Sequence, residues 1–149
     1  MKYKDIVAIY EVLKDAQISG LSKEAKLAVI KAMMVLKRLY DNHQEEMKLA
    51  QEKIVTKEVQ EAYSRIQQVN SDMEGKNMKD WPEETRNSYL KDSEVVNKAN
   101  ADYAHATQGL ADTLCDTDFE RIGEDAVLQL IDDNKINMQS AMTLIEYLA

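Results

Sequence analysis

The sequence predicts a mostly all-α protein in which a short N-terminal helix, a long antiparallel coiled-coil-like hairpin and a C-terminal pair of short helices form one domain. Three observations predict it. The 149 residues include only four Gly and one Pro, so turns are few. Apolar residues recur at spacings of three and four over long stretches. Met and Ala are plentiful while Phe and Trp occur once each, which favours slender helix seams over a thick core. This length suits a single domain.

Residues 1–20 contain the predicted N-terminal helix. Its apolar positions fall at helical spacing and are Tyr3, Ile6, Val7, Tyr10 and Leu13. We expect this helix to end near Gln17, with Gly20 closing the connection to the next one.

Residues 22–114 are predicted to form the helical hairpin. Ser22 is a suitable N-cap, and the helical pattern then continues far beyond a typical helix length. A coiled-coil seam follows, formed by Leu36, Tyr40, His43, Met47, Ala50 and Ile54. The phase slips between Ile54 and Val59, so a stutter, a kink and a break are all open, and a continuous but bent helix is favoured. The tip is expected near residues 74–80.

The returning helix repeats an apolar residue every seven positions, at Tyr89, Val96, Tyr103 and Leu110. If the chain reverses at the tip, Leu110 faces Met47 and Tyr103 faces Ile54, while Val96 faces Val59 and Tyr89 faces Ile66. Two helices alone bury such stripes poorly. The N-terminal helix, the C-terminal part or another chain is therefore needed to cover the remainder.

Residues 115–149 are predicted to form an acidic segment and a C-terminal helical lobe. From Thr113 to Phe119 the side chains alternate with a period of two, which indicates either a short strand near residues 113–119 or an irregular acidic linker. A strand here needs a partner, either residues 1–4 or another chain. Glu124 then opens a helix that stops at Asn134, and Asn137 caps the last helix.

The net charge of −8 argues against a nucleic-acid groove, because phosphate binding is driven by Lys and Arg. The charge is unevenly distributed. Residues 1–40 carry eight Lys and Arg against four Asp and Glu, whereas residues 81–149 carry five against fourteen. Such asymmetry is complemented within the fold or between copies, or it reflects solvated helix faces.

Cys115 is the only cysteine, so no internal disulfide is possible and a reducing cytoplasm is expected. Asp5 and Glu11 interrupt the region where a signal peptide needs an apolar core, and no apolar run approaches ~20 residues. We therefore expect a soluble protein that is not exported by this route.

Two candidate metal patterns fail on spacing. His43-x-x-Glu46 and Asp102-x-x-His105 are typical of metal-binding bundles, but the predicted hairpin register separates them by ~12 Å. A calcium loop beginning at Asp116 would need Gly at Arg121 and Glu at Val127. No phosphate-binding loop, nucleophile elbow or zinc knuckle is present. We expect no enzyme activity, no cofactor and no catalytic or metal-binding residue.

The residues chosen as candidates for a protein interaction lie at the hairpin tip and in the strand-like segment. They are Trp81, Phe119, Asp116, Asp118 and Glu120.

The chain resembles a loose family of short helical proteins encoded among the structural genes of tailed bacteriophages. The resemblance covers the opening MKYKDIVAIYEVLKDAQISGLSKEAKLAVIKAMMVL, the charged hairpin and the closing FERIGEDAVLQLIDDNKINMQSAMTLIEYL. It implies a virion component or assembly factor without a cofactor, in several copies, located in the virion or the host cytoplasm, with protein partners and no nucleic acid or membrane. It carries over no functional residues. The alternative is an acidic inhibitor or DNA mimic that binds a host protein.

Overall fold

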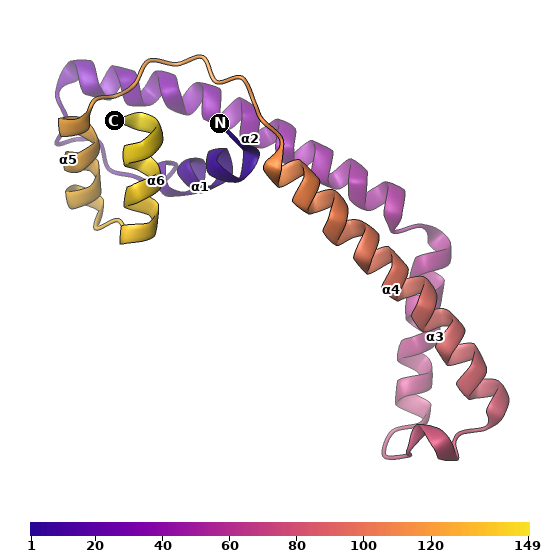
Figure 1. The fold of residues 1–149 in the computed structure, drawn as a ribbon. Helices are drawn as coiled ribbons and strands as arrows, with labels where there is room; N and C mark the ends of the chain where they lie inside the picture. Colours follow the sequence, from indigo (N-terminus) through magenta and orange to yellow (C-terminus); the bar gives the residue numbers. More distant parts are fainter. The chain divides into compact units, whose positions relative to one another are not determined.

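The computed structural model describes residues 1–149 and is all-α, which confirms the predicted class (Figure 1). Its elements in chain order are α1 (Tyr3–Leu13), α2 (Lys23–Ile54), α3 (Lys57–Asp72), the short 3-10 helix η1 (Met78–Asp80), α4 (Glu83–Asp112), α5 (Glu124–Asn134) and α6 (Met138–Leu148). The chain divides into two compact units. Residues 1–46 and 109–149 form what we call the terminal unit, and residues 47–108 form the arm.

The core of the terminal unit joins both ends of the chain. Fully buried aliphatic side chains come from α1, α2, α5 and α6, and they are Ile6, Ile9, Leu36, Val127, Leu130, Leu144 and Leu148. Figure 1 shows α1, α5 and α6 grouped along the N-terminal half of α2. Burying this apolar set drives the folding of the unit, because each buried side chain contributes about 1.5–3 kcal/mol before entropy is counted.

The connection between α1 and α2 is longer than predicted, since α1 ends at Leu13 and not near Gln17. Gln17 lies outside the helix, and the side chain of Asn134 bonds its backbone on both sides, accepting from the N–H at 2.7 Å and donating to the carbonyl at 3.0 Å. Gly20 then passes so close to α5 that a Cβ atom would lie 2.5 Å from the carboxylate of Asp133. A side chain at position 20 would displace the Asp133 carboxylate.

Local capping fixes three of the helix starts. The Ser22 hydroxyl accepts from the Ala25 amide at 3.1 Å, and the Asn137 side chain accepts from the Ser140 amide at 3.0 Å, as the sequence predicts. The preference for a continuous bent helix across residues 54–59 is wrong. α2 ends at Ile54, and Thr56 caps a new helix by accepting from the Val59 amide. The β-branched run Ile54-Val55-Thr56 supplies both a weak helix end and a good cap.

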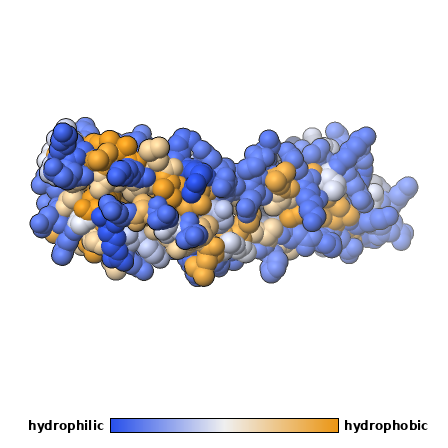
Figure 2. All heavy atoms as spheres, turned by 90° about the horizontal axis from the view of Figure 1, so that it is seen from above, coloured by the Kyte–Doolittle hydropathy of each residue, from blue (hydrophilic) through white to orange (hydrophobic).

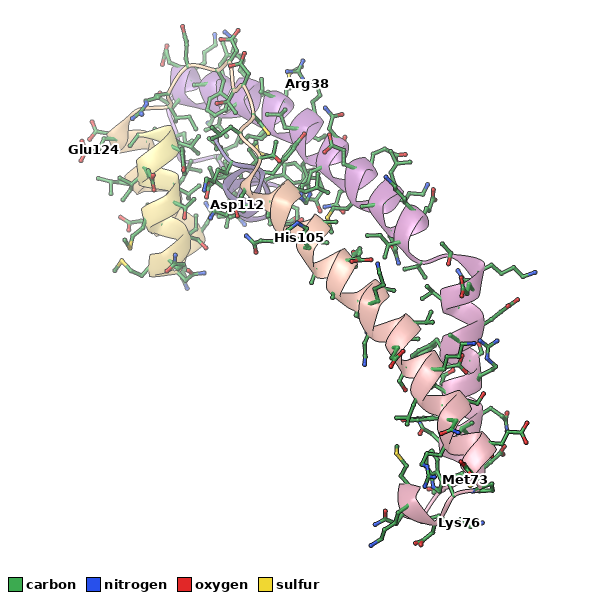
Figure 3. The ribbon with its side chains drawn as sticks, turned by 45° about the vertical axis from the view of Figure 1, so that its right-hand side comes forward. Arg38, Met73, Lys76, His105, Asp112 and Glu124 are labelled. Atoms are coloured by element: carbon green, nitrogen blue, oxygen red, sulfur yellow. The ribbon has the colours of Figure 1, made fainter.

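The arm contains the end of α2, α3 and most of α4, and α3 and α4 run side by side in opposite directions (Figures 1 and 3). Its tip spans residues 73–82, close to the predicted position. Only Ala62, Ala99 and Asp92 are buried there. Val59 and Val96 line one groove, but the full seam register stays a prediction. The arm therefore has almost no core of its own.

Asp92 is the one buried charged residue of the protein, with 8% of its surface exposed. Its two carboxylate oxygens accept from Nε and Nη2 of Arg65 at 2.9 and 2.8 Å, which joins α3 to α4. These bonds hold the pKa of Asp92 below its usual range. A paired, doubly bonded carboxylate is tolerated where an unpaired one would not be.

Replacing Asp92 with Asn should destabilise the arm by about 1 kcal/mol, since the charge-assisted bonds to a half-exposed Arg65 are lost. Because the pKa of Asp92 is depressed in the folded state, its contribution is present above the unfolded value and disappears as the pH falls through the folded value. Urea unfolding followed by circular dichroism at several acidic pH values checks both effects. Asp102→Asn, which removes an exposed pair with Lys98 on the same helix, is the control. Equal effects of the two variants would contradict this role for Asp92.

A second polar contact ties α6 to α1. The Tyr147 hydroxyl donates to Oδ2 of Asp5 at 2.9 Å, and this bond is the main reason that the pKa of Tyr147 is raised to about 12. Tyr147→Phe should therefore cost about 1 kcal/mol at neutral pH. The contribution is complete below the unfolded tyrosine pKa and is lost as the pH rises toward 12, so the variant should lose less stability than the wild type in alkali. Tyr63→Phe, at an exposed ring of the arm, is the matched control for chemical denaturation.

Candidate interaction surfaces

The strand-like segment is extended but forms no strand. One isolated antiparallel bridge joins Leu114 to Lys2. On either side of it, the Tyr3 amide donates to the Thr113 carbonyl at 3.1 Å, and the Cys115 amide donates to the Met1 carbonyl at 2.8 Å. The segment thus pairs with residues 1–4, one of the two predicted partners, but only over a single bridge. Beyond Cys115 it is irregular, as in the predicted linker alternative.

Ion pairs stabilise this contact between the N-terminal residues and the end of α4. Asp112, at the end of α4, forms ion pairs with Lys2 at 3.3 Å and with Lys4 at 3.2 Å. Cys115 is half-buried, and burial raises the pKa of its thiol, so it stays protonated at neutral pH. Part of the positive charge of the N-terminal segment is therefore compensated by negative charge within the terminal unit.

The predicted alternation of residues 114–120 is present in their burial. Cys115, Thr117 and Phe119 are half-buried, whereas Leu114, Asp116, Asp118 and Glu120 are exposed. Asp116, Asp118 and Glu120 thus form an acidic outer edge. Phe119 instead packs against the hydrophobic core, so it is an anchor for the segment more than a surface for a partner.

Trp81 lies in the arm, apart in the sequence from the other four candidates, which belong to the terminal unit. Its ring meets Tyr89 edge-on with centroids 5.1 Å apart, and its Nε1 donates to the Lys76 carbonyl at 3.4 Å. Trp81 is half-buried by these contacts. Contacts within the tip therefore cover much of the Trp81 side chain.

Asp80 is the last residue of η1, and α4 begins at Glu83. Trp81 therefore lies in the short link between these two helices.

Sequence reasoning missed a row of exposed apolar residues on α2. Leu27, Ile30 and Met34 are 54%, 48% and 70% exposed. They lie at spacings of three and four on the face opposite the buried residues Val29, Ala32, Leu36 and Leu39. Figure 2, which views the molecule from above α2, shows apolar residues gathered on the terminal unit among polar ones. The sequence does contain a signal for this row, because the first half of this helix is apolar on two sides.

A similar row lies on α6. Met138, Met142 and Ile145 are exposed at spacings of four and three, while Ala141, Leu144 and Leu148 face the core. α6 is therefore also apolar on two faces. Exposed apolar rows of this kind are typical of protein-contact surfaces.

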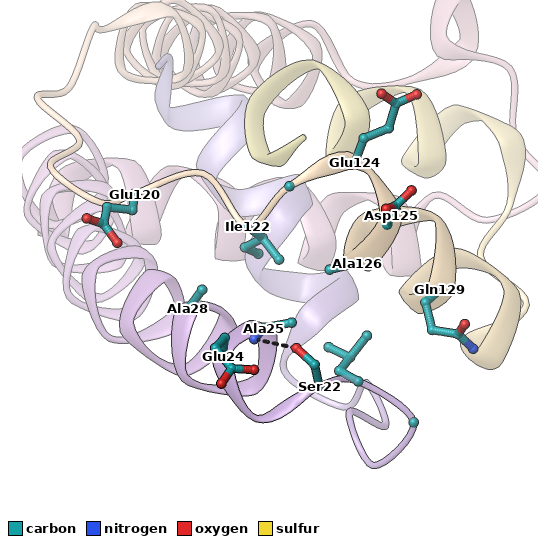
Figure 4. Close-up of a pocket in the computed structure, with 13 residues that line it drawn as sticks. Ser22, Glu24, Ala25, Ala28, Glu120, Ile122, Glu124, Asp125, Ala126 and Gln129 are labelled. Carbon is teal, nitrogen blue, oxygen red and sulfur yellow. Dashed lines mark hydrogen bonds between the residues drawn. The ribbon is translucent and has the colours of Figure 1, made fainter.

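Two grooves lie on the surface, one in each unit. The first, about 590 Å³, lies between the starts of α2 and α5, and its lining includes Glu24, Glu120, Glu124 and Asp125; the Glu124 carboxylate is turned away from it (Figure 4). These groups lie spread around it, where those at the helix N-termini offset the helix dipoles. The second, about 320 Å³, runs along the arm and is lined by apolar seam residues that include Val55, Tyr63 and Tyr103.

The two His patterns fall in different units, with His43 in the terminal unit and His105 in the arm (Figure 3). His43 packs on Tyr3 with ring centroids 5.0 Å apart. Its buried Nδ1 has no hydrogen-bond partner. No group of three or more His, Cys, Asp or Glu side chains is arranged to hold a metal ion.

Comparison of the chain with protein families, with curated proteins and with solved structures gave no match. None of the helices combines the length and the apolar character that crossing a membrane requires.

Phe119→Asp should release the segment of residues 113–123 from the terminal unit, because it places a carboxylate against the core. We expect a loss of about 1–3 kcal/mol in unfolding stability and faster amide exchange in that segment. Hydrogen exchange measured by mass spectrometry checks this. Asp118→Asn, on the exposed side of the same segment, should leave exchange unchanged. Unaltered exchange in the Phe119 variant would show that this ring does not anchor the segment.

Proposed function

We propose that this protein is a non-enzymatic helical scaffold that acts as a structural or assembly component of a tailed-phage virion. The observation that carries the scaffold role is the amount of ordered apolar surface left uncovered. Rows on α2 and α6 are exposed, and the seam of the arm is barely buried. A chain that leaves its helix faces uncovered in this way gains stability when partners cover them.

The phage context rests on the resemblance of the opening and closing segments to short helical proteins of phage structural modules. The architecture supports it in a general way. A helical arm with little core and a terminal unit with outward apolar rows suit a protein that is completed by neighbours in an assembly. Its partners are proteins, either further copies or other virion components, and no cofactor takes part.

The test is to purify the protein and measure its mass by light scattering over a wide concentration range. In parallel, it is incubated with the capsid, portal and tail proteins encoded in the same genome. We expect either self-association or stable binding to one of these proteins. A strict monomer at the highest concentration that binds none of them would overturn the proposal.

The acidic edge formed by Asp116, Asp118 and Glu120 favours a second candidate, an acidic inhibitor or DNA mimic of a host protein. These three carboxylates are exposed and make no ion pair within the chain. Binding through them would weaken steeply with salt, because exposed charges are screened within about 10 Å at 0.1 M. Partner binding that persists at high salt favours the scaffold.

A further inference from the structure

The exposed face of α2 combines an apolar centre with cations. Leu27, Ile30 and Met34 form the centre. Lys23 lies four residues before Leu27 on the same face, and Lys31 and Arg38 lie four residues after Leu27 and Met34. Figure 3 shows Arg38 pointing away from α2. Lys23, Lys31 and Arg38 are the charged residues of this face, and Asp118 and Glu120 border it beside Lys31 and Met34.

These cations have no ion-pair partner within the protein. Lys37 pairs with Asp41, and Lys31 shares a groove with Asp118 and Glu120 without forming a salt bridge. Lys23 and Arg38 form no salt bridge, and they are the free cations of this face. The face therefore offers a partner both apolar surface and free positive charge.

The C-terminal pair of helices carries the opposite charge on α5 and a similar apolar row on α6. On α5, Leu128 is exposed with Glu124 four residues before it and Asp132 four residues after it, on one face. Neither carboxylate forms a salt bridge, and Figure 3 shows Glu124 pointing outward. α6 packs against α5 and contributes the exposed row Met138, Met142 and Ile145. Residues 121–149 carry two Lys and Arg against five Asp and Glu.

We propose that the α2 face of one copy of this chain docks on the α5–α6 face of a second copy. This inference rests on the proposed scaffold function and names the partner. Leu27, Ile30 and Met34 would meet the apolar row of α6, while the free cations of α2 would meet the free carboxylates of α5. Charge complementarity identifies the occupant, because the two faces of one chain carry the opposite signs that steer association.

Charge also decides how the copies are arranged. Two α2 faces packed on each other would oppose cations to cations, and two α5–α6 faces would oppose carboxylates to carboxylates. Unlike faces therefore pair, which is a heterologous contact and produces a ring or a filament instead of a closed dimer. Each junction in such an assembly is the same single contact, so we expect association that grows with concentration and gains further stability only where a ring closes.

Two variants test this arrangement. Met34→Asp damages the α2 face and Met142→Asp damages the α6 row, and both positions are more than 60% exposed, so folding should be retained. Sedimentation velocity of the wild type should show assemblies that grow with concentration. Each variant should associate about a hundredfold more weakly, because a carboxylate is buried in an apolar contact. Leu49→Asp, on the same helix but in the arm and 55% exposed, should behave as the wild type.

Mixing the variants gives the sharper result. Each retains one intact face, so an equimolar mixture should form a one-to-one dimer that does not grow further. A mixture that remains monomeric, or a Met142→Asp variant that associates like the wild type, would overturn the proposed pairing.

Failure here is distinguishable from failure of the scaffold function. A wild-type chain that stays monomeric but binds a virion protein refutes self-docking and leaves the scaffold intact. A chain that does neither refutes both.

Discussion

The packing of α1 against α6, which in turn packs against α5, is the interaction on which the rest of the structure depends. It joins segments more than 100 residues apart, and the buried residues Ile6 and Ile9 share one core with Leu144 and Leu148. The contact of Tyr147 with Asp5 adds a polar link between the same elements. Because both ends of the chain are fixed in this core, α2 leaves the unit toward the arm and α4 returns from it. Closing so large a loop is entropically costly, so this core must be the principal source of stability.

The arm depends on different interactions. Small residues, Ala62 and Ala99, are its only buried apolar side chains, and the bidentate pair of Arg65 with Asp92 gives its helices a specific polar contact. An isolated pair of helices gains little from propensity alone. Its apolar seam residues around Val59 and Tyr103 line a groove and do not form a core. Such a unit is stabilised readily by a partner that covers the groove.

The fold class and several boundaries were predictable because they depend on local chemistry. Ser22 and Asn137 cap their helices through contacts within three residues, and α5 begins and ends where its charges and Asn134 indicate. The break after Ile54 was one of three open alternatives, and the phase slip before Val59 fits a stutter, a kink and a break equally well. The side-chain cap of Thr56 is the feature that distinguishes a break. The short bridge at Leu114 could not be told from a strand, since the alternation of side chains is the same in both.

The interaction surfaces were harder to predict for a physical reason. Periodicity identifies an apolar helix face, but it does not show whether that face meets the core or solvent, and Met34 and Leu36 look equivalent in sequence. Of the five predicted contact residues, the structure places Asp116, Asp118 and Glu120 on the surface, while Phe119 and Trp81 are partly used in internal packing.

The structure shows which charges of the uneven sequence are compensated within the fold and which are not. Asp112 satisfies Lys2 and Lys4 at the junction between the chain's first residues and the end of α4. Asp118 and Glu120 line a groove together with Lys31 and Met34, so part of the acidic segment lies along the basic helix. No ion pair is formed by Lys23 and Arg38 on the α2 face, and none is formed by Glu124 and Asp132 on α5. The charges that the fold leaves uncompensated therefore sit beside the apolar rows that it leaves uncovered, and a protein contact that buries those rows would bring these charges close to an oppositely charged surface.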